Sequence, residues 1–395
     1  MELTEKQKQG LDIAVARYEK RQKYTVISGY AGTGKSTLVK FIISALPGID
    51  PDKDVVFTSF TGKATQVLQN KGNKHTLTLH KLLYESHPRP DGTFFRRPVA
   101  GIPFKVVVVD EISMAPKTLI DLLMKYDVYV ICLGDPFQLP PVDKNEDNHL
   151  LDNPHIFLDE IMRQAAESEI IQLTMKIRNG EPIDNFKGKE VQVLSRDELT
   201  TGMLTWADQV LVATNATRQS INNKMRELYN KSGDPQDGDK VICCRNYWED
   251  ESLGGSALVN GTIGHLKNTY ESFVKIPPFI DGKGQMIKTI NADFLSETNE
   301  LYPMIHMDKK LILEGTKSLD FKIEYRLGKN KNMQHLIPYE FTYGYAITTH
   351  RAQGSEWEKV LVIEEKFPFS KEEHARWLYT ACTRASEKLV LIRTD

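Results

Sequence analysis

The nine residues "GYAGTGKST", from Gly29 to Thr37, constrain the fold more than any other stretch of the chain. They contain the pattern Gly-x-x-x-x-Gly-Lys-Ser, and they lie between a short apolar run, "YTVIS", and a helical pattern, "TLVKFIISAL". Glycines in such a loop allow turns that are closed to other residues, so successive backbone N–H groups can point inward at an anion. A strand, a glycine-rich loop and a helix N-terminus in this order predict a polyphosphate site in an α/β domain.

The residue types of this loop suit a nucleoside triphosphate and a magnesium ion. Lys35 would reach the β- and γ-phosphates, and the hydroxyl of Ser36 would ligate Mg²⁺. We therefore expect ATP and Mg²⁺ as cofactors. The remaining loop positions that we assign to nucleotide binding are Gly29, Gly32, Thr33, Gly34 and Thr37.

Length and composition indicate an ordinary globular protein with more than one domain. The chain has 395 residues, of which 40% are apolar and 26% are charged. Its longest apolar runs, such as "VVVV" at 106–109, are too short to span a bilayer, and its N-terminus does not resemble a signal peptide. We expect a cytoplasmic protein with no membrane partner. The four cysteines have no C-x-x-C spacing, so neither a zinc site nor a disulfide framework is indicated.

The net charge of −2 argues against a protein that coats nucleic acid by bulk electrostatics. It leaves room for a local basic channel. The segments "RPDGTFFRR" at 89–97 and "RLGKNKN" at 326–332 are candidates for such a channel, although runs of this kind are often only solvated loops.

Apolar runs of strand length alternate with helical stretches along most of the chain. Such runs fit strands that are buried on both faces of a parallel sheet with flanking helices, which is an α/β architecture. The seven runs are residues 24–28, 54–59, 105–110, 129–134, 209–214, 359–364 and 388–393.

The alternation fails at two apparent insertions. Residues 83–104 carry four prolines and a Pro-Asp-Gly turn between residues that could pair as a hairpin. Residues 265–338 are polar and irregularly patterned, which favours a small β-rich module. The second α/β segment is thus split, and it resumes near Tyr339.

Several polar residues follow predicted strands and could carry chemistry. Asp110 and Glu111 end the run "VVVVDE". Beside a phosphate-binding loop, one carboxylate can complete the coordination shell of Mg²⁺, and the adjacent carboxylate can accept a proton from the attacking water. Gln138, in "GDPFQLPP", either senses the γ-phosphate or is an exposed residue of an Asp-Pro turn. Arginines delivered into the site would stabilise the charge that spreads over the γ-phosphate, and the candidates are Arg163, Arg351 and Arg384.

Gln7 has two interpretations. In "TEKQ", Thr4 and Gln7 form a capping-box pattern, in which the glutamine folds back on the helix N-terminus. The same amide could instead recognise an adenine edge. The pattern alone favours the cap.

With these residues assembled, the sequence resembles a superfamily 1 DNA helicase of the RecD-like and Dda-like branch. The similar motifs run in family order over nearly the whole chain: "LTEKQ" 3–7, "GYAGTGKST" 29–37, "FTGKA" 60–64, "TLH" 78–80, "VVDEISM" 108–114, "GDPFQLPPV" 134–142, "IMRQ" 161–164, "ATN" 213–215, "AITTHRAQGSEW" 346–357 and "YTACTRA" 379–385.

The resemblance implies a motor of two RecA-like domains with parallel sheets and with ATP bound between them. The first would span residues 1–207, with 83–104 as a hairpin, or pin, that splits the duplex. The second would combine 208–264 with 339–395, and 265–338 would be an inserted SH3-like module. The first domain would supply Lys35, Ser36, Asp110 and Glu111, and Gln138 would couple the γ-phosphate to motion.

The same resemblance assigns the other nucleotide contacts. Arg163 and Arg384 would reach the γ-phosphate. Gly354 and Glu356 would bind the nucleotide, with Glu356 at the ribose. Gln7 would recognise the adenine base. A chain whose first motif begins at residue 3 is expected to be a minimal motor of the Dda type. Branch membership further implies 5′-to-3′ travel, which the residues do not show directly.

The resemblance also implies a path for single-stranded DNA. Hydroxyl and backbone groups would hold phosphates along this path while the domains open and close with each ATP. The residues at the family positions are Thr61, Thr78, His80, Thr214, Asn215, Thr348 and His350. Phe94 and Phe95 either stack on the last base pair or anchor the hairpin to its domain.

The leading hypothesis is an ATP-driven helicase acting on single-stranded DNA and on single-strand/duplex junctions, as a monomer. Single-strand-binding, replication or recombination proteins are expected partners. One alternative is a translocase that displaces proteins without unwinding DNA, and another is an ATP-gated nucleic-acid clamp. Glu111 and Arg384 argue against the clamp because a clamp needs neither. The residues leave RNA open as a substrate.

Overall fold

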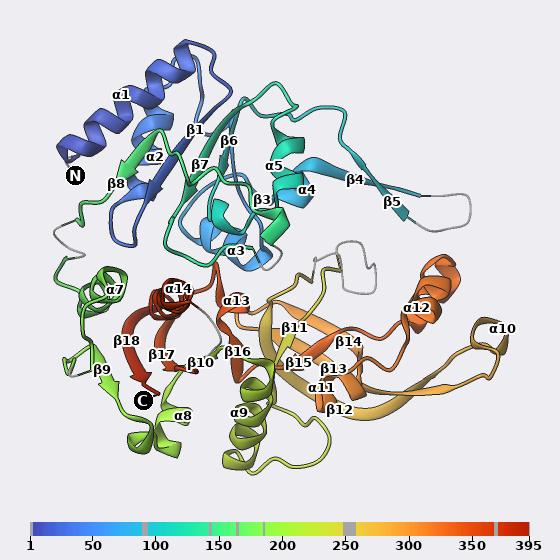
Figure 1. Cartoon of the computed structure of the whole chain (residues 1–395). Helices are drawn as coiled ribbons and strands as arrows, with labels where there is room; N and C mark the ends of the chain where they lie inside the picture. The colour runs from blue at the N-terminus through green and yellow to red at the C-terminus, as the bar shows by residue number, and fades with distance from the viewer. Residues whose placement is uncertain are drawn as a thin grey trace. The chain divides into compact units, whose positions relative to one another are not determined.

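The computed structural model of the chain describes residues 3–88, 94–141, 144–162, 166–184, 186–247, 258–366 and 370–394. The chain forms two compact units. The first comprises Met1–Tyr84, Pro98–Ala213 and Thr348–Asp395, and the second comprises Glu85–Arg97 and Thr214–Ile347. The first unit contains parallel sheets with helices, and the second is built around an antiparallel sheet. Figure 1 labels the elements of both.

A six-stranded parallel sheet forms the first layer of the first unit, in the order β3-β2-β6-β7-β1-β8. The runs predicted as buried strands form its four central members because their side chains are apolar on both faces. Its strands are β1 (Tyr24–Gly29), β2 (Val55–Ser59), β3 (Thr76–Thr78), β6 (Val106–Val109), β7 (Tyr129–Gly134) and β8 (Ile156–Leu158). The helices of this part are α1 (Glu5–Glu19), α2 (Lys35–Ala45), α3 (Gly62–Asn70), α4 (Leu79–Leu83) and α5 (Lys117–Leu123).

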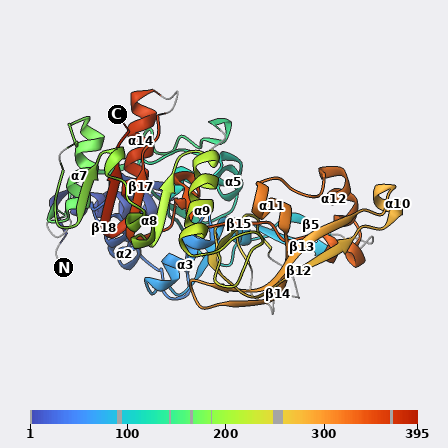
Figure 2. The same cartoon turned by 90° about the horizontal axis from the view of Figure 1, so that it is seen from below.

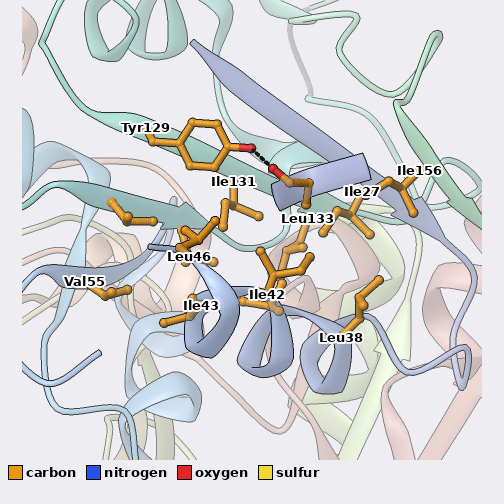
Figure 3. Close-up of a cluster of buried hydrophobic side chains, with 14 of the residues drawn as sticks. Ile27, Leu38, Ile42, Ile43, Leu46, Val55, Tyr129, Ile131, Leu133 and Ile156 are labelled. Atoms are coloured by element: carbon orange, nitrogen blue, oxygen red, sulfur yellow. Dashed lines mark hydrogen bonds between the residues drawn. The ribbon is translucent and has the colours of Figure 1, made fainter. Parts of the chain in front are cut away.

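The core beneath the phosphate-binding loop is continuous from the sheet to α2. Ile27 of β1 and Leu38 and Ile42 of α2 are fully buried in one cluster, which Figure 3 shows. Tyr129 enters the same cluster, where its hydroxyl lies 3.1 Å from the carbonyl oxygen of Ala14 and donates to it. The apolar face of α2 thereby fixes the helix N-terminus to the end of β1.

A second parallel sheet of the first unit contains the strands β10-β17-β18-β9 in that order. These are β9 (Val191–Leu194), β10 (Gln209–Val212), β17 (Trp357–Ile363) and β18 (Ala385–Ile392), accompanied by α7 (Glu169–Asn179), α8 (Thr201–Trp206), α13 (Thr349–Ala352) and α14 (Lys371–Cys382). Because β9 pairs with β18, the second sheet begins before the predicted boundary at residue 207. The sequence hid this because β9, "VQVL", is short and its apolar run is interrupted by Gln192.

The second unit contains an antiparallel sheet in the order β14-β13-β12-β11-β15. Its strands are β11 (Lys240–Cys243), β12 (Ile263–Lys275), β13 (Met286–Ser296), β14 (Leu301–Asp308) and β15 (Phe341–Tyr343). The β-rich module predicted for 265–338 is thus part of a larger sheet that takes one strand from each side of that range. The sequence did not reveal this because β11 and β15 are short apolar runs like those of the parallel sheets.

The remaining elements of the second unit are the hairpin of β4 (Tyr84–Pro88) and β5 (Phe94–Pro98), and α9 (Asn215–Leu228), α10 (Pro278–Asp281), α11 (Lys309–Glu314) and α12 (Phe321–Gly328). The hairpin forms within the range 83–104, as the turn pattern predicted. Both views place α10 and α12 at the far end of the long β12–β13 ladder (Figures 1 and 2). β16 (Ala346–Thr348) then leads the chain to the last segment of the first unit. Among the described residues, no helix is long and apolar enough to cross a membrane.

Candidate nucleotide and nucleic-acid sites

The phosphate-binding loop joins β1 to α2 in the conformation that its glycines predict. Gly32 and Gly34 have φ of 77° and 79°, in the left-handed region that favours glycine. Gly34 is the N-cap of α2, so the loop delivers its backbone directly to the helix N-terminus. A Cβ on Gly29 would lie 2.8 Å from the carbonyl oxygen of Leu158 on β8, which makes glycine necessary there too.

Lys35 and Asp110 lie close enough to influence one another. The Lys35 Nζ donates to the carbonyl oxygens of Gly29 and Tyr30, at 2.7 and 3.0 Å, and thus spans the loop. Asp110 follows β6, and one of its carboxylate oxygens accepts from the backbone N–H of Glu111 at 2.9 Å. Burial and the neighbouring Glu111 carboxylate raise the pKa of Asp110 to about 6, although Lys35 acts in the opposite direction.

These residues fit a magnesium ion. Mg²⁺ is bound through one or two carboxylate or hydroxyl oxygens and substrate phosphates rather than by an all-protein cage. Asp110 supplies a shielded carboxylate whose charge is disfavoured by its surroundings, and a divalent cation would compensate that charge. Ser36 presents an exposed hydroxyl in the first turn of α2. Both are hard oxygen donors.

Gln138 connects two other predicted catalytic residues. With its amide oriented to satisfy its neighbours, the nitrogen donates to the Glu111 carboxylate at 3.0 Å and the oxygen accepts from Arg384 Nη2 at 3.3 Å. Glu111 itself has a φ of 53°, a strained backbone for a non-glycine residue, and such strain is often found at functional sites. The structure thus joins a carboxylate, an amide and an arginine that are far apart in sequence.

Arg384 is buried and held in a defined position between α14 and β18. Its guanidinium donates to the carbonyl oxygens of Thr380 and Ser355, at 3.2 and 3.3 Å, and to the Thr383 hydroxyl at 3.1 Å. Among the described residues, the hydrogen-bond partners of Arg384 are neutral groups, so its positive charge is not paired with a carboxylate there. It is suited to stabilise negative charge that develops nearby.

Tyr379 and Asp135 belong to the site although the sequence did not single them out. The Tyr379 hydroxyl donates to the Asp135 carboxylate at 2.6 Å and accepts from the backbone N–H of Ala31, in the phosphate-binding loop, at 2.9 Å. Burial and the Asp135 charge raise the pKa of Tyr379 well above its usual range. Both residues lie inside motifs that the sequence did identify, "GDPFQ" and "YTACTRA", and that position was the available signal.

The turn that carries Gln138 is fixed to the C-terminal segment at a second place. The backbone N–H of Leu139 donates to the Thr380 hydroxyl at 3.0 Å, and its carbonyl oxygen accepts from the Gln353 amide at 2.8 Å. Next to Gln353, Gly354 has a φ of 73°, and a Cβ there would lie 2.7 Å from the Cβ of Ala64. Glycine is therefore required at 354 for packing against α3.

Gln7 forms the capping box and also faces the phosphate-binding loop. Its side-chain oxygen accepts from the Thr4 backbone N–H at 3.1 Å, while the Thr4 hydroxyl accepts from the Gln7 N–H at 3.2 Å. Its amide nitrogen donates to the carbonyl oxygen of Thr33 at 3.3 Å. The cap is confirmed, and the contact with adenine stays a prediction.

The threonines predicted to line the single-strand path share one structural position. Thr61, Thr78, Thr214 and Thr348 are the N-cap residues of α3, α4, α9 and α13, each at the carboxyl end of a strand. Helix N-termini at strand ends offer backbone N–H groups and a partial positive charge to phosphates. Thr214 and Asn215 lie in the second unit, and Asn215 is exposed at the first turn of α9.

The two histidines of the predicted path lie next to these caps. His80, after Thr78, packs its ring 5.7 Å from that of Phe60. His350 is mostly buried, and burial lowers its pKa. The His350 side chain therefore presents no fixed positive charge, and its role in binding phosphate would depend on hydrogen bonding.

The structure leaves other predicted site residues without such geometry. Glu356 is exposed at the start of β17, where a ribose contact stays a prediction. Arg163, and the side chains of Phe94 and Phe95, lie outside the described residues. Thr37 is half-buried in the first turn of α2.

The fold and site define a P-loop nucleoside triphosphatase with two parallel sheets. A family model described as an AAA domain matches residues 2–198, and one described as a UvrD-like helicase C-terminal domain matches residues 343–392. The chain belongs to the superfamily 1 helicases, on the branch that contains RecD-like, Dda-like and Pif1-like proteins.

Relatives support this placement. The ATP-dependent RecD2 DNA helicase of Deinococcus radiodurans is 25% identical over 93% of this chain and 46% of its own length. The ATP-dependent DNA helicase dda of Enterobacteria phage T4 is 29% identical over 45% of this chain and 43% of its own length. An uncharacterized protein, R530, of Acanthamoeba polyphaga mimivirus is 24% identical over 93% of this chain and 94% of its own length. The chain thus spans about half the length of the two named helicases that it matches.

Solved structures agree at the level of the fold. A structure of Pif1 helicases on forked double-stranded DNA aligns over 100% of this chain and 95% of its own, with a TM-score of 0.53 and 18% identity. The Pif1 helicase of Candida albicans gives a TM-score of 0.51 with the same coverage and identity. The family expected from the sequence motifs, and the α/β fold with RecA-like sheets, are confirmed.

Proposed function

We propose that the chain is an ATP-dependent DNA helicase that moves 5′-to-3′ along single-stranded DNA and unwinds duplex DNA. The observation that carries the proposal is the connection of Glu111 through the Gln138 amide to Arg384. A simple nucleotide-binding clamp needs neither a general base nor a buried arginine at this place. Motion requires that the γ-phosphate site be linked to distant elements, and Gln138 supplies such a link.

Each residue has a role in hydrolysis. The backbone of Gly29–Thr37 and Lys35 bind the phosphates, and Glu111 accepts a proton from the attacking water. Arg384 stabilises the charge on the transferring phosphoryl group, together with Arg163. Mg²⁺, held by Ser36 and Asp110, would neutralise charge between the β- and γ-phosphates.

The roles of the other nucleotide contacts follow from their positions. Gln7 recognises adenine, with its amide already fixed beside the loop by Thr4 and Thr33. Glu356 binds the ribose from the exposed start of β17. Gly354 allows the close approach of this segment to α3.

Single-stranded DNA binds along the helix N-caps at Thr61, Thr78, Thr214 and Thr348, which hold phosphates through hydroxyl and backbone groups. The division into two RecA-like domains, an SH3-like module and a strand-splitting pin belongs to this proposal. So do a cytoplasmic location, a monomeric state, and single-strand-binding, replication or recombination proteins as partners.

The first test is ATP hydrolysis with and without an unstructured single-stranded DNA oligonucleotide, with Lys35→Ala as the blank. Strong stimulation that Lys35→Ala abolishes is the expected result. A real basal rate that DNA leaves unchanged would overturn the DNA motor and would direct the search to RNA or a protein track. A forked duplex and a protein-blocked single strand then separate the helicase from the translocase that only displaces proteins.

A further inference from the structure

The outer face of α12 gathers aromatic and basic side chains. Phe321, Lys322, Tyr325, Arg326 and Lys329 fall on one side of this helix and its C-cap, and all five are exposed. The pattern i, i+1, i+4, i+5, i+8 is that of a single helix face. This segment overlaps "RLGKNKN", a basic run that the proposed motor does not use.

The carboxylates of the same helix point elsewhere or are already paired. Asp320 is the N-cap, and its side chain accepts from the backbone N–H groups of Lys322 and Ile323 at 2.8 and 2.9 Å. Glu324 is mostly buried and pairs with Arg245, and it also lies 3.4 Å from Lys317. The exposed face therefore carries a concentrated positive charge on a chain whose net charge is −2.

The two aromatic rings are presented to solvent rather than packed. Phe321 is 80% exposed and Tyr325 is 55% exposed. Their ring centroids are 6.2 Å apart with planes inclined by only 19°, and Lys329 Nζ lies 4.4 Å from the Tyr325 ring centroid. Nearby, Phe279 on α10 is 72% exposed. An exposed aromatic patch on a rigid element is a marker of a binding surface.

The helix is held firmly from below. Leu327 is fully buried in a small core with Ile276, Ile280 and Ile287, against which Ile323 packs. Arg326 also donates to the carbonyl oxygen of Ile280 at 2.8 Å, which ties α12 to α10. A platform that is already ordered loses little conformational entropy on binding.

We propose that this outer face of α12 is an accessory binding site for single-stranded DNA. Bases stack on Phe321 and Tyr325, and Lys322, Arg326 and Lys329 bind the phosphates. Parallel ring planes flanked by cations suit a flexible strand with flat bases better than an acidic peptide, which would use the charges but not the ring faces. This proposal rests on the proposed function in one respect, namely that the nucleic acid bound by the chain is DNA.

The test uses the full chain and two oligonucleotides of about 10 and about 40 nucleotides, since single-strand sites of this kind cover about 4–16 nucleotides each. Phe321→Ala with Tyr325→Ala should weaken binding of the long strand about tenfold or more, because each stacked base contributes measurably. Lys322→Gln with Lys329→Gln should lower the slope of log affinity against log salt by about 1.4, at about 0.7 for each phosphate that is no longer neutralised. Stimulation of ATP hydrolysis by the short strand should stay unchanged in both variants.

The matched controls alter equally exposed residues elsewhere. Phe273→Ala with Met304→Ala removes two exposed apolar side chains from the β-sheet, and Lys117→Gln with Lys125→Gln removes two charges near α5. Neither should change binding of the long strand. Photocrosslinking of the long strand, with iodouracil as the reactive base, should label Tyr325 or Phe321.

Unchanged binding of the long strand in the aromatic variant, with no crosslink to α12, would overturn the proposal. So would weaker binding of an acidic peptide by that variant when DNA binding is normal, because the face would then be a protein-docking surface. A crosslink to α12 in a chain whose ATP hydrolysis ignores DNA would keep this site while overturning the proposed motor. DNA-stimulated hydrolysis without a crosslink to α12 would support the proposed motor while overturning this site.

Discussion

The Tyr379 hydroxyl lies 2.6 Å from the Asp135 carboxylate and bridges it to the backbone N–H of Ala31. One phenol on α14 thereby connects the phosphate-binding loop to the turn after β7. Burial raises the pKa of Asp135 and of Tyr379. The Tyr379 hydroxyl therefore keeps its proton and donates it in the hydrogen bond to Asp135. The position of the loop depends on a residue nearly 350 positions further along the chain.

Replacing Tyr379 by phenylalanine should loosen the loop. The change leaves the Ala31 N–H without its acceptor and removes one of the donors to the Asp135 carboxylate, which keeps the Phe137 N–H at 2.9 Å. An unpaired buried polar group costs about 1–3 kcal/mol. If part of that cost appears as disorder of the loop, KM for ATP should rise about tenfold, since 1.4 kcal/mol corresponds to a factor of ten. Steady-state ATP hydrolysis with DNA present measures this, and Tyr229→Phe, at an exposed tyrosine, is the control. An unchanged KM in Tyr379→Phe would show that the loop keeps its position without the bridge.

Arg384 should act on turnover and not on binding. Arg384→Ala is expected to spare ATP binding and to lower kcat by about 10³-fold or more, the scale for arginines that reach a transferring phosphoryl group. Because the side chain is also buried against Thr380 and Ser355, thermal unfolding of the variant must be compared with that of the parent. Normal DNA-stimulated hydrolysis in a folded Arg384→Ala chain would exclude the assigned role.

The order of motifs and the seven apolar runs were sufficient to predict the α/β fold because each run is long and apolar on both faces. β3, "TLT", and β9, "VQVL", were missed because polar residues interrupt their short apolar runs. The range 265–338 was correctly predicted to be β-rich, but the limits of the antiparallel sheet were not predicted. Its strands β11 and β15 lie outside that range, in segments whose short apolar runs resemble those of the parallel sheets.

The sequence could name candidate catalytic residues because their motifs specify residue types at fixed spacing, and their roles stay predictions. Tyr379 and Asp135 were not, because a hydrogen bond between residues 244 positions apart leaves no local pattern. Gln7 illustrates the opposite case, in which the local pattern was correct. The capping box that the sequence favoured is present, and the contact of the same amide with adenine stays a prediction.

The two roles of Gln7 can be separated by substitution. Thr4→Ala removes the cap alone and should lower the free energy of unfolding by about 1 kcal/mol without changing the preference for ATP over GTP. Gln7→Glu keeps an acceptor for the Thr4 N–H but loses the amide donor, so the ratio of KM for GTP to KM for ATP should fall. The measurement is hydrolysis of both nucleotides by each variant. A Gln7→Glu chain with the parental ratio would leave the cap as the whole function of this residue.

Glu364 should make stability depend on pH. It follows β17, and its carboxylate accepts from His374 at 2.8 Å, from Arg393 Nε at 2.6 Å and from the Thr394 N–H at 3.1 Å. Burial alone would raise the pKa of Glu364, but these partners outweigh it and the pKa is lowered from 4.5. The unfolded chain therefore takes up this proton first as the pH falls. The stabilisation is complete well above pH 4.5 and is lost as the pH drops below that value towards the folded-state pKa.

Glu364→Gln should accordingly lower the free energy of unfolding at pH 7 by about 1–3 kcal/mol, because the ends of β17, α14 and β18 lose a shared charged acceptor. The difference from the parent should shrink as the pH falls below 4.5, where the parent carboxylate itself becomes neutral. Urea unfolding at a series of pH values measures both effects. Glu358→Gln, at an exposed position of β17, is the control and should stay within about 0.5 kcal/mol of the parent throughout. A Glu364→Gln deficit that does not vary between pH 7 and pH 4 would mean that packing, and not the charge, is what the carboxylate contributes.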